Sequence, residues 1–144
     1  MAGTITAANA VLTLSVANLF PVPQQIQGFA ADDVFDTEDL ETAEMSMGVD
    51  GKLSAGFVYN PVKQGFSLQA DSASNDFFEA IYAAERAARD KFALNGSVLL
   101  PAVGKLYTMT QGFMTGYKPM SDAKRTLQPR KFTLTWESVL PAVV

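Results

Sequence analysis

Hydrophobic and polar residues alternate along most of the chain, and this alternation predicts β-strands. Residues 12–16 place Leu, Leu and Val between Thr and Ser, the period of two expected for a strand with one buried face. The same period is clearest over residues 132–137, where Phe, Leu and Trp alternate with Thr, Thr and Glu. Pro21 and Pro23 are expected to interrupt the first strand, because proline cannot donate a hydrogen bond to a neighbouring strand. Further strands are predicted over residues 24–30, 45–47, 53–59, 66–70, 97–100 and 106–115.

A tight hairpin turn is predicted at Val49-Asp50-Gly51-Lys52, because Asp-Gly favours the turns whose twist matches paired strands. The residues expected on one face of the returning strand are Leu53, Ala55, Phe57 and Tyr59. Before the hairpin, residues 32–44 are acidic and poor in strand-forming residue types. They are therefore expected to form a long loop or arm.

The period changes to that of a helix between Asp76 and Leu94. The apolar stripe consists of Phe77, Ile81, Ala84, Ala88 and Phe92, with Phe78 and Tyr82 beside it. Asp76 and Glu79 have the spacing of a capping box, with Ser74 as the rival N-cap. Asn95-Gly96 is expected to end the helix. Two pairs at i, i+4, Glu85 with Arg89 and Arg86 with Asp90, predict an exposed face.

These elements predict a mainly β (α+β) fold, an antiparallel β-sandwich or barrel with one flanking amphipathic α-helix. Residues 1–144 are expected to form a single domain with an extended acidic arm at about 31–45. No run of apolar residues is long enough for a transmembrane helix, and the N-terminus lacks the basic region of a signal peptide. We therefore expect a soluble, unprocessed product.

The composition argues against an enzyme. The 144 residues include no His and no Cys, which removes imidazole and thiolate metal ligands, cysteine nucleophiles and the commonest general base near neutral pH. The acidic segment has no central glycine and does not fit a calcium-binding loop. We accordingly expect no catalytic residue, no metal and no cofactor. The larger aromatic residues are expected in the core: Phe57, Tyr59, Phe66, Phe77 and Trp136.

The formal charge of −4 hides an uneven distribution along the chain. Residues 1–70 hold eight acids against two lysines, a charge of −6, and residues 71–144 hold seven acids against nine bases, a charge of +2. The densest acidic cluster is Asp32, Asp33, Asp36, Glu38, Asp39, Glu41 and Glu44. An acidic protrusion with separate basic patches suits head-to-tail contacts between identical copies. The alternative, that the two halves interleave and the asymmetry carries no meaning, is equally compatible with the sequence.

The order of these elements resembles that of the small, single-domain tail tube proteins of contractile-tailed bacteriophages. The resemblance rests on three segments: Gly48-Val-Asp-Gly-Lys-Leu-Ser, Ser67-Leu-Gln-Ala-Asp-Ser-Ala-Ser-Asn-Asp-Phe-Phe and Arg130-Lys-Phe-Thr-Leu-Thr-Trp-Glu. It implies a virion protein, assembled in the host cytoplasm, that forms stacked hexameric rings through which DNA passes without sequence-specific binding. Tail sheath, baseplate and tape-measure proteins are the partners that the resemblance implies.

On this reading, residues 32–44 would reach an adjacent ring and meet the basic segment of Lys118, Lys124 and Arg125. The exposed helix charges Arg86, Arg89 and Asp90 would face neighbouring subunits or a surrounding sheath, with the helix on the outer face of the sheet. The polar residues suited to lining a lumen are Thr13, Ser15, Ser54, Ser67, Gln69, Thr108, Thr110, Thr133 and Thr135. A tail terminator, a baseplate ring protein and a monomeric β-sandwich binding module are the alternatives.

Overall fold

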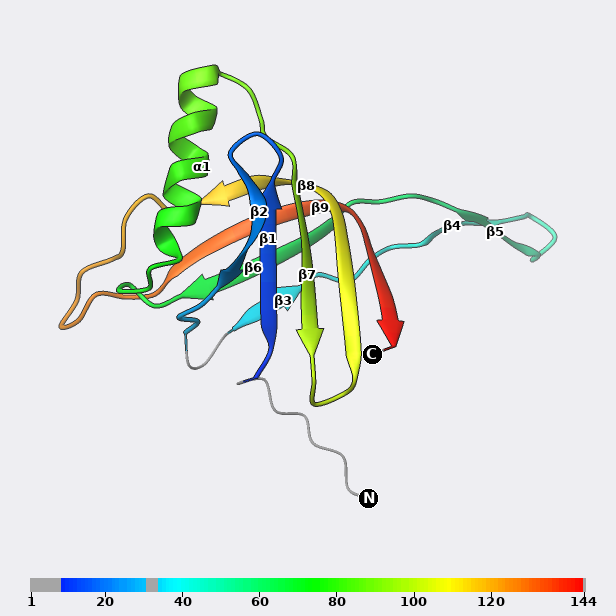
Figure 1. The fold of residues 1–144 in the computed structure, drawn as a ribbon. Coiled ribbons are helices and arrows are strands. Elements are labelled where there is room, and N and C mark those ends of the chain that lie inside the picture. Colours follow the sequence, from blue (N-terminus) through cyan, green and yellow to red (C-terminus); the bar gives the residue numbers. More distant parts are fainter. Residues whose placement is uncertain (1–8, 31–33, 144) are drawn as a thin grey trace.

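The computed structural model describes residues 9–30 and 34–143, and the predicted site residues Asp32 and Asp33 lie outside that part. Seven strands form one antiparallel sheet in the order β2-β1-β7-β8-β9-β6-β3, and β4 and β5 form a separate hairpin (Figure 1). The elements are β1 (Val11–Val16), β2 (Phe20–Ile26), β3 (Phe35–Thr37), β4 (Ala43–Met47), β5 (Leu53–Phe57), β6 (Val62–Leu68), α1 (Asn75–Ala88), β7 (Leu94–Leu100), β8 (Lys105–Tyr117) and β9 (Arg130–Val143). The predicted fold class is confirmed.

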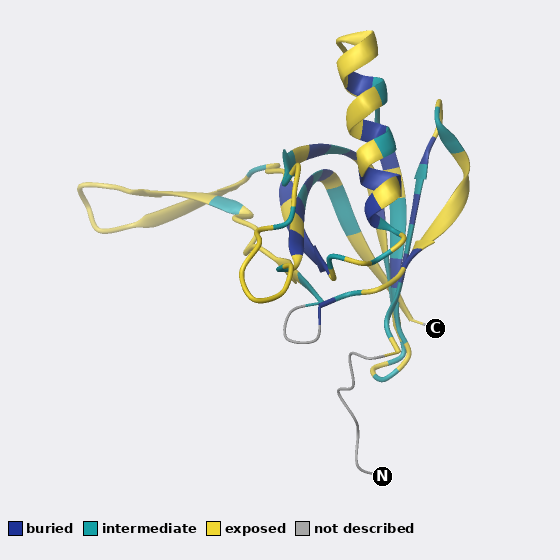
Figure 2. Cartoon of the chain, turned by 90° about the vertical axis from the view of Figure 1, so that its left-hand side faces the viewer, coloured by how far each residue is buried: buried dark blue, intermediate teal, exposed yellow. Residues whose placement is uncertain are grey.

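The sheet curls around its own core, and α1 packs at one end of it. The long strands β8 and β9 bend, so that β1, β7 and the adjoining halves of β8 and β9 lie in front of β6 and β3 in Figure 1. Buried residues line the inside of this curl and one stripe of the helix (Figure 2). The largest fully buried side chains are Trp136, Phe66, Phe78 and Phe132. The helix therefore covers part of the core and leaves the front face of the sheet open.

Pro21 and Pro23, expected to interrupt the first strand, lie inside β2, so the predicted second strand over 24–30 is wrong in its bounds. β2 is an edge strand that pairs only with β1, in the register Leu12↔Ile26, and the pairing is irregular toward Phe20. Proline is tolerated at such an edge because one side of the strand needs no donors. The sequence pattern does not reveal which strands lie at an edge.

The helix is shorter than predicted and ends at Ala88, because Arg89 adopts the left-handed conformation with φ of 55°. Asn95-Gly96, the predicted end of the helix, lies inside β7. A methyl group on Gly96 would come within 2.6 Å of Leu14 and 2.7 Å of the Thr13 carbonyl oxygen. This glycine therefore serves the close approach of β7 to β1 and has no part in a helix cap.

The predicted contacts at the helix surface are also corrected. Ser74 is the N-cap residue, and no side chain makes a capping hydrogen bond. Glu79 forms an ion pair with Arg130 at 2.7 Å, which replaces its role in the predicted capping box. Glu85 is buried and pairs with Lys91 at 2.7 Å, so it does not belong to the predicted exposed face.

The acidic segment is not one irregular loop. Phe35–Thr37 forms β3 and pairs with β6, and Ala43–Met47 forms β4 and pairs with β5. The part that projects from the molecule is the β4–β5 hairpin with its flanking segments, residues 38–61, which we call the arm (Figure 1). The predicted turn at Val49-Asp50-Gly51-Lys52 forms its tip, where the Gly48 N–H bonds the Lys52 carbonyl oxygen.

Candidate assembly surfaces

The arm has one apolar and one polar face. Cross-strand pairing joins Ala43 to Phe57, Met45 to Ala55 and Met47 to Leu53 on one side of the ribbon. The residues paired on the other side are Glu44, Ser46, Ser54 and Gly56. Directly paired residues of antiparallel strands point to the same face. The apolar face is therefore continuous from the root of the arm to its tip.

This apolar face is exposed within the chain. Met45, Met47 and Leu53 have exposed fractions of 55%, 64% and 57%. Phe57 and Tyr59, which were expected in the core, are 71% and 92% exposed and contact each other edge to face. They miss the core because the arm leaves the sheet between β3 and β6. A lone two-stranded ribbon is marginally stable in water, and a contiguous exposed apolar surface marks an interaction site.

The structure separates the predicted acidic cluster into groups with different surroundings. Asp36 lies on β3, where its carboxylate accepts hydrogen bonds from the Gly65 N–H and from Lys131. Glu38, Asp39 and Glu41 are exposed at the root of the arm, and Glu44 lies on its polar face. The described acids of the arm are thus directed toward solvent, and Asp36 belongs to the sheet.

The predicted basic segment forms the loop between β8 and β9, which we call the basic loop (residues 118–129). Lys118 pairs with Asp122 at 3.0 Å inside this loop, and Lys124 and Arg125 are exposed. Arg130 holds the loop in place, because its Nε and one terminal nitrogen donate to the Lys118 carbonyl oxygen. The basic loop and the arm project from opposite sides of the molecule (Figure 1). The two predicted partners therefore do not meet within one chain.

The predicted outer helix residues Arg86, Arg89 and Asp90 gather at the C-terminal end of α1. They line a shallow depression above the buried carboxylate of Glu85. Lys91 bonds this carboxylate and also donates to the Met114 carbonyl oxygen at 2.8 Å. Lys91, itself half exposed, thus ties the segment after the helix to β8, and the three predicted residues remain exposed nearby.

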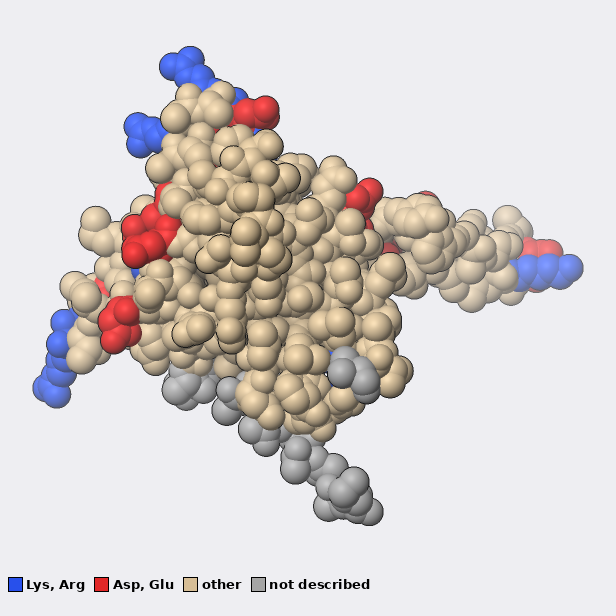
Figure 3. Space-filling model, in the orientation of Figure 1, with Lys and Arg blue, Asp and Glu red and all other residues tan. Residues whose placement is uncertain are grey.

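On the front face of the sheet, the outward residues of β1 and β7 and of the halves of β8 and β9 beside them carry no charge. Register places these residues in two full rows, Val11, Leu99, Leu106 and Ala142, and Thr13, Ser97, Thr108 and Leu140; the pairs Ser15–Asn95 and Thr110–Ser138 follow on either side of the irregularity between β7 and β8. Figure 3 shows this face as an uncharged area, with the acidic and basic side chains around its periphery. Four of the polar residues predicted to line a lumen lie here: Thr13, Ser15, Thr108 and Thr110.

The other residues of that predicted polar set lie elsewhere. Ser67 is buried on β6, and Ser54 lies on the arm. Thr133 and Thr135 occupy the half of β9 that pairs with β6, and Gln69 follows that strand. Beyond Trp136, β6 no longer accompanies β9. Within the described part of the chain, the outer edge of β9 from Glu137 to Val143 is left without a neighbouring strand.

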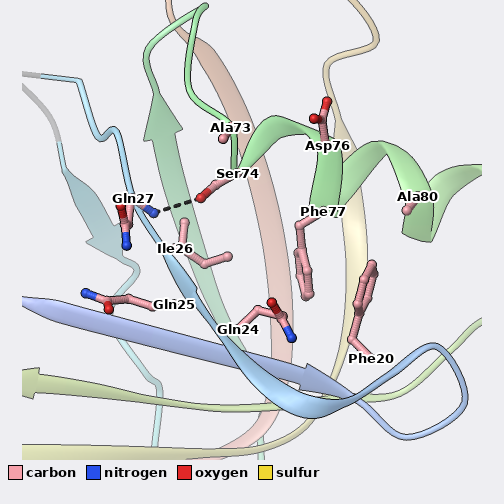
Figure 4. A pocket seen from close by; sticks show the side chains of 10 residues that line it. All are labelled: Phe20, Gln24, Gln25, Ile26, Gln27, Ala73, Ser74, Asp76, Phe77 and Ala80. Carbon is pink, nitrogen blue, oxygen red and sulfur yellow. Dashed lines mark hydrogen bonds between the residues drawn. The ribbon is translucent and has the colours of Figure 1, made fainter.

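A groove of about 540 Å³ lies between β2 and the first turns of α1 (Figure 4). Its floor contains Phe20 and Phe77, whose ring centroids are 4.8 Å apart. Gln24, Gln25 and Gln27 line its β2 side, and Asp76 is the one charged residue that lines it. The Gln27 N–H donates to Ser74 Oγ at 2.8 Å, which joins the two walls.

Among the described residues, no group of three or more acidic side chains has the geometry of a metal site. No helix in that part of the chain is long and apolar enough to span a membrane.

Sequence reasoning missed the two-faced arm and the groove. The apolar face of the arm could have been inferred, because apolar residues at positions 45, 47, 53, 55 and 57 alternate symmetrically about the Asp-Gly turn. The sequence does not show that the rest of the chain places no core against this face. The groove had no sequence signal, since β2 and α1 are brought together only by the fold.

Comparisons with known proteins agree with this architecture. Residues 3–140 match the model of the family described as "Tail fiber protein gp32". The chain belongs to this family. No curated protein sequence matches it. The family and the fold together place the chain among phage tail-related proteins, and the resemblance noted in the sequence is confirmed at that level.

Solved structures share the fold of this gp32-family chain over nearly its whole length. A chain of the PVC sheath–tube complex, from an extracellular contractile injection system, matches with a TM-score of 0.65 and 13% identity, covering 98% of this chain and 93% of that one. The sheath/tube terminator of the same system gives 0.65 and 12%, covering 99% of both chains. The 6-fold symmetrised baseplate of the anti-feeding prophage gives 0.61 and 11%, covering 100% and 99%. Identities this low establish the fold alone.

Proposed function

We propose that this gp32-family protein is a structural subunit of the tail tube, and that six copies form a ring and rings stack into a conduit for DNA. The observation that carries the proposal is the row of uncharged outward residues on β1, β7 and the adjoining halves of β8 and β9, a face that α1 does not cover. A face without lysine or arginine offers phosphate no counter-charge, so it suits the passage of DNA better than its retention.

The dimensions agree with a shared barrel. Four strands from each of six copies give ~24 strands, which at ~4.8 Å spacing and ~40° tilt make a circumference of ~150 Å. The backbone diameter is then ~48 Å, and side chains reduce the lumen to ~38 Å, wide enough for a DNA duplex. The open edge of β9 lies at one side of this four-stranded face and β1, which β2 flanks, lies at the other, so neighbouring copies would meet along these two sides.

The predicted charged residues take positions that suit contacts between copies. The exposed acids of the arm and the basic loop lie on opposite sides, as head-to-tail association requires. Arg86, Arg89 and Asp90 would then face a neighbouring subunit or a surrounding sheath. Sheath, baseplate and tape-measure proteins are the further partners in this proposal, and the assembled virion is its location. The protein would work by geometry, without catalysis or a cofactor.

Negative-stain microscopy and light scattering of the purified chain test the proposal. We expect six-membered rings that grow into tubes as the protein concentration rises. A monomer at every concentration and salt would overturn the proposal.

A terminator or baseplate ring protein is the second candidate, favoured by the match to the sheath/tube terminator over 99% of both chains. This candidate differs in its stacking, because a terminator closes a tube and does not extend it. Single rings or pairs of rings that never lengthen would favour it over the tube subunit.

A further inference from the structure

The apolar face of the arm has no counterpart within its own chain. The arm projects from the side of the sheet opposite to α1 and β2 (Figure 1). From its root at Glu38 to its tip, about 12 residues at ~3.3 Å each give a reach of roughly 40 Å. That length is enough to lie across a neighbouring copy. Met45, Met47, Leu53 and Phe57 lie exposed on one side of the ribbon, and a contiguous apolar surface of this kind marks an interaction site.

We propose that the groove between β2 and α1 of a second copy receives the apolar face of the arm. This inference rests on the proposed self-assembly and identifies the two surfaces that meet. The groove lies on the side of the molecule that faces away from the arm, so the contact joins one copy to the next and leaves the arm of the second copy free for a third. A heterologous contact of this kind builds rings or stacks.

The chemistry of the groove matches that of the arm. Phe20 and Phe77 present aromatic rings, and methionine sulfur makes favourable contacts with aromatic rings. The arm contributes Met45 and Met47 from its apolar face. A two-stranded ribbon also carries unpaired backbone N–H and C=O groups along its outer edges. The primary amides of the groove glutamines both donate and accept, so they can bond either kind of backbone group.

The charges are complementary as well. Asp76 is the one charged side chain that lines the groove, and it stands on the first turn of α1 (Figure 4). Lys52 is the one base of the arm, and it lies at the exposed tip. Docking of the tip at the α1 side of the groove pairs these two residues. Opposite charges across an interface fix register and disfavour wrong alignments.

A charge swap tests the pairing. We expect Lys52→Asp and Asp76→Lys, made singly, each to raise the protein concentration needed for assembly by roughly tenfold, because each places like charges together. The double variant should restore assembly toward that of the unmodified chain. Asp71→Lys, which changes the charge equally at an exposed position outside the groove lining, is the matched control and should assemble normally. Single reversals that assemble like the control would overturn the docking.

Disulfide cross-linking between engineered cysteines tests the same contact. Because the chain has no native cysteine, any disulfide must join the engineered positions. A mixture of Met47→Cys chains and Gln24→Cys chains should form a disulfide-linked heterodimer on mild oxidation, whereas Ser46→Cys, on the polar face of the arm, should not pair with Gln24→Cys. Dimers of Met47→Cys alone would mean that arms cover one another, and would overturn the groove as the receptor. If the unmodified chain never associates, the proposed function fails and the docking fails with it; if it assembles and the cross-link is absent, the docking alone fails.

Discussion

At the scale of single residues, the tightest constraint in the core is the contact between Gly112 and Trp136. The two residues are paired across β8 and β9, and the indole is fully buried. Its Nε1–H donates to Gln64 Oε1 at 3.1 Å, which fixes the orientation of the ring. A methyl group on Gly112 would lie well inside contact distance of the ring. Glycine is therefore required here by the space that tryptophan occupies.

We expect Gly112→Ala to lower the free energy of unfolding by about 1–3 kcal/mol, because a buried ring held by a hydrogen bond cannot move aside without strain. Gly56→Ala is the control, since a methyl group there meets no atom within 4 Å and should change stability by less than about 0.5 kcal/mol. Urea unfolding followed by tryptophan fluorescence measures both. Equal stability of the two variants would contradict the steric argument.

At the scale of elements, Arg130 joins three parts of the fold. Its guanidinium is buried, pairs with Glu79 of α1, donates twice to the Lys118 carbonyl oxygen, and lies over the rings of Tyr117 and Phe132. The start of β9 thereby holds both the helix and the basic loop. The position of that loop, which the proposed ring contact uses, depends on this one side chain.

Replacement of Arg130 by methionine should lower the free energy of unfolding by about 1–3 kcal/mol, because the partly buried Lys118 carbonyl oxygen and the Glu79 carboxylate lose their charged donor. The basic loop should also become more sensitive to trypsin at Lys124 and Arg125. Lys131→Met removes the neighbouring ion pair with Asp36, which is half exposed, and should cost at most about 1 kcal/mol. Similar stability and similar trypsin sensitivity of the two variants would show that Arg130 does not hold the basic loop in position.

At the scale of the whole molecule, the uncharged face is the feature that the proposed conduit depends on. Its central row contains Thr13, Ser97 and Thr108, on strands whose opposite face packs against the core. A charge introduced there would be repeated six times around a ring of ~48 Å diameter. Neighbouring copies of it would lie farther apart than the ~8 Å over which physiological salt screens charges, so assembly should tolerate it.

We expect Thr108→Lys tubes to form normally and to retain duplex DNA at low salt, with retention lost as salt rises, because lysines in the lumen would release counterions from the phosphates. Ala87→Lys adds the same charge on the exposed surface of α1 and is the control. Co-sedimentation of each variant with DNA across a salt series measures the difference. Equal DNA binding by the two would place Thr108 outside the lumen.

Much of the fold follows from local pattern. Burial of residues 12, 14 and 16 on β1, and of 132, 134 and 136 on β9, agrees with their alternation, and the Asp-Gly turn lies where its residue types predict. These features are local, because a period of two and a turn sequence act between neighbouring residues. The end of the helix was misplaced because Asn95 and Gly96 have the same residue types in a helix cap and in a closely packed strand.

The candidate assembly surfaces also combine features that follow from local sequence with features that depend on the fold. Antiparallel strands with one amphipathic helix, the lack of histidine and cysteine chemistry, and the uneven distribution of acidic and basic residues all follow from the order of the amino acids. That Phe57 and Tyr59 lie in solvent while Phe66 and Trp136 lie in the core becomes visible only in the folded chain. The physical reason is that alternation specifies two faces of a strand, whereas burial depends on what the rest of the chain places against each face. The described part of the chain packs nothing against the apolar face of the arm, and we expect a second copy to bind that face.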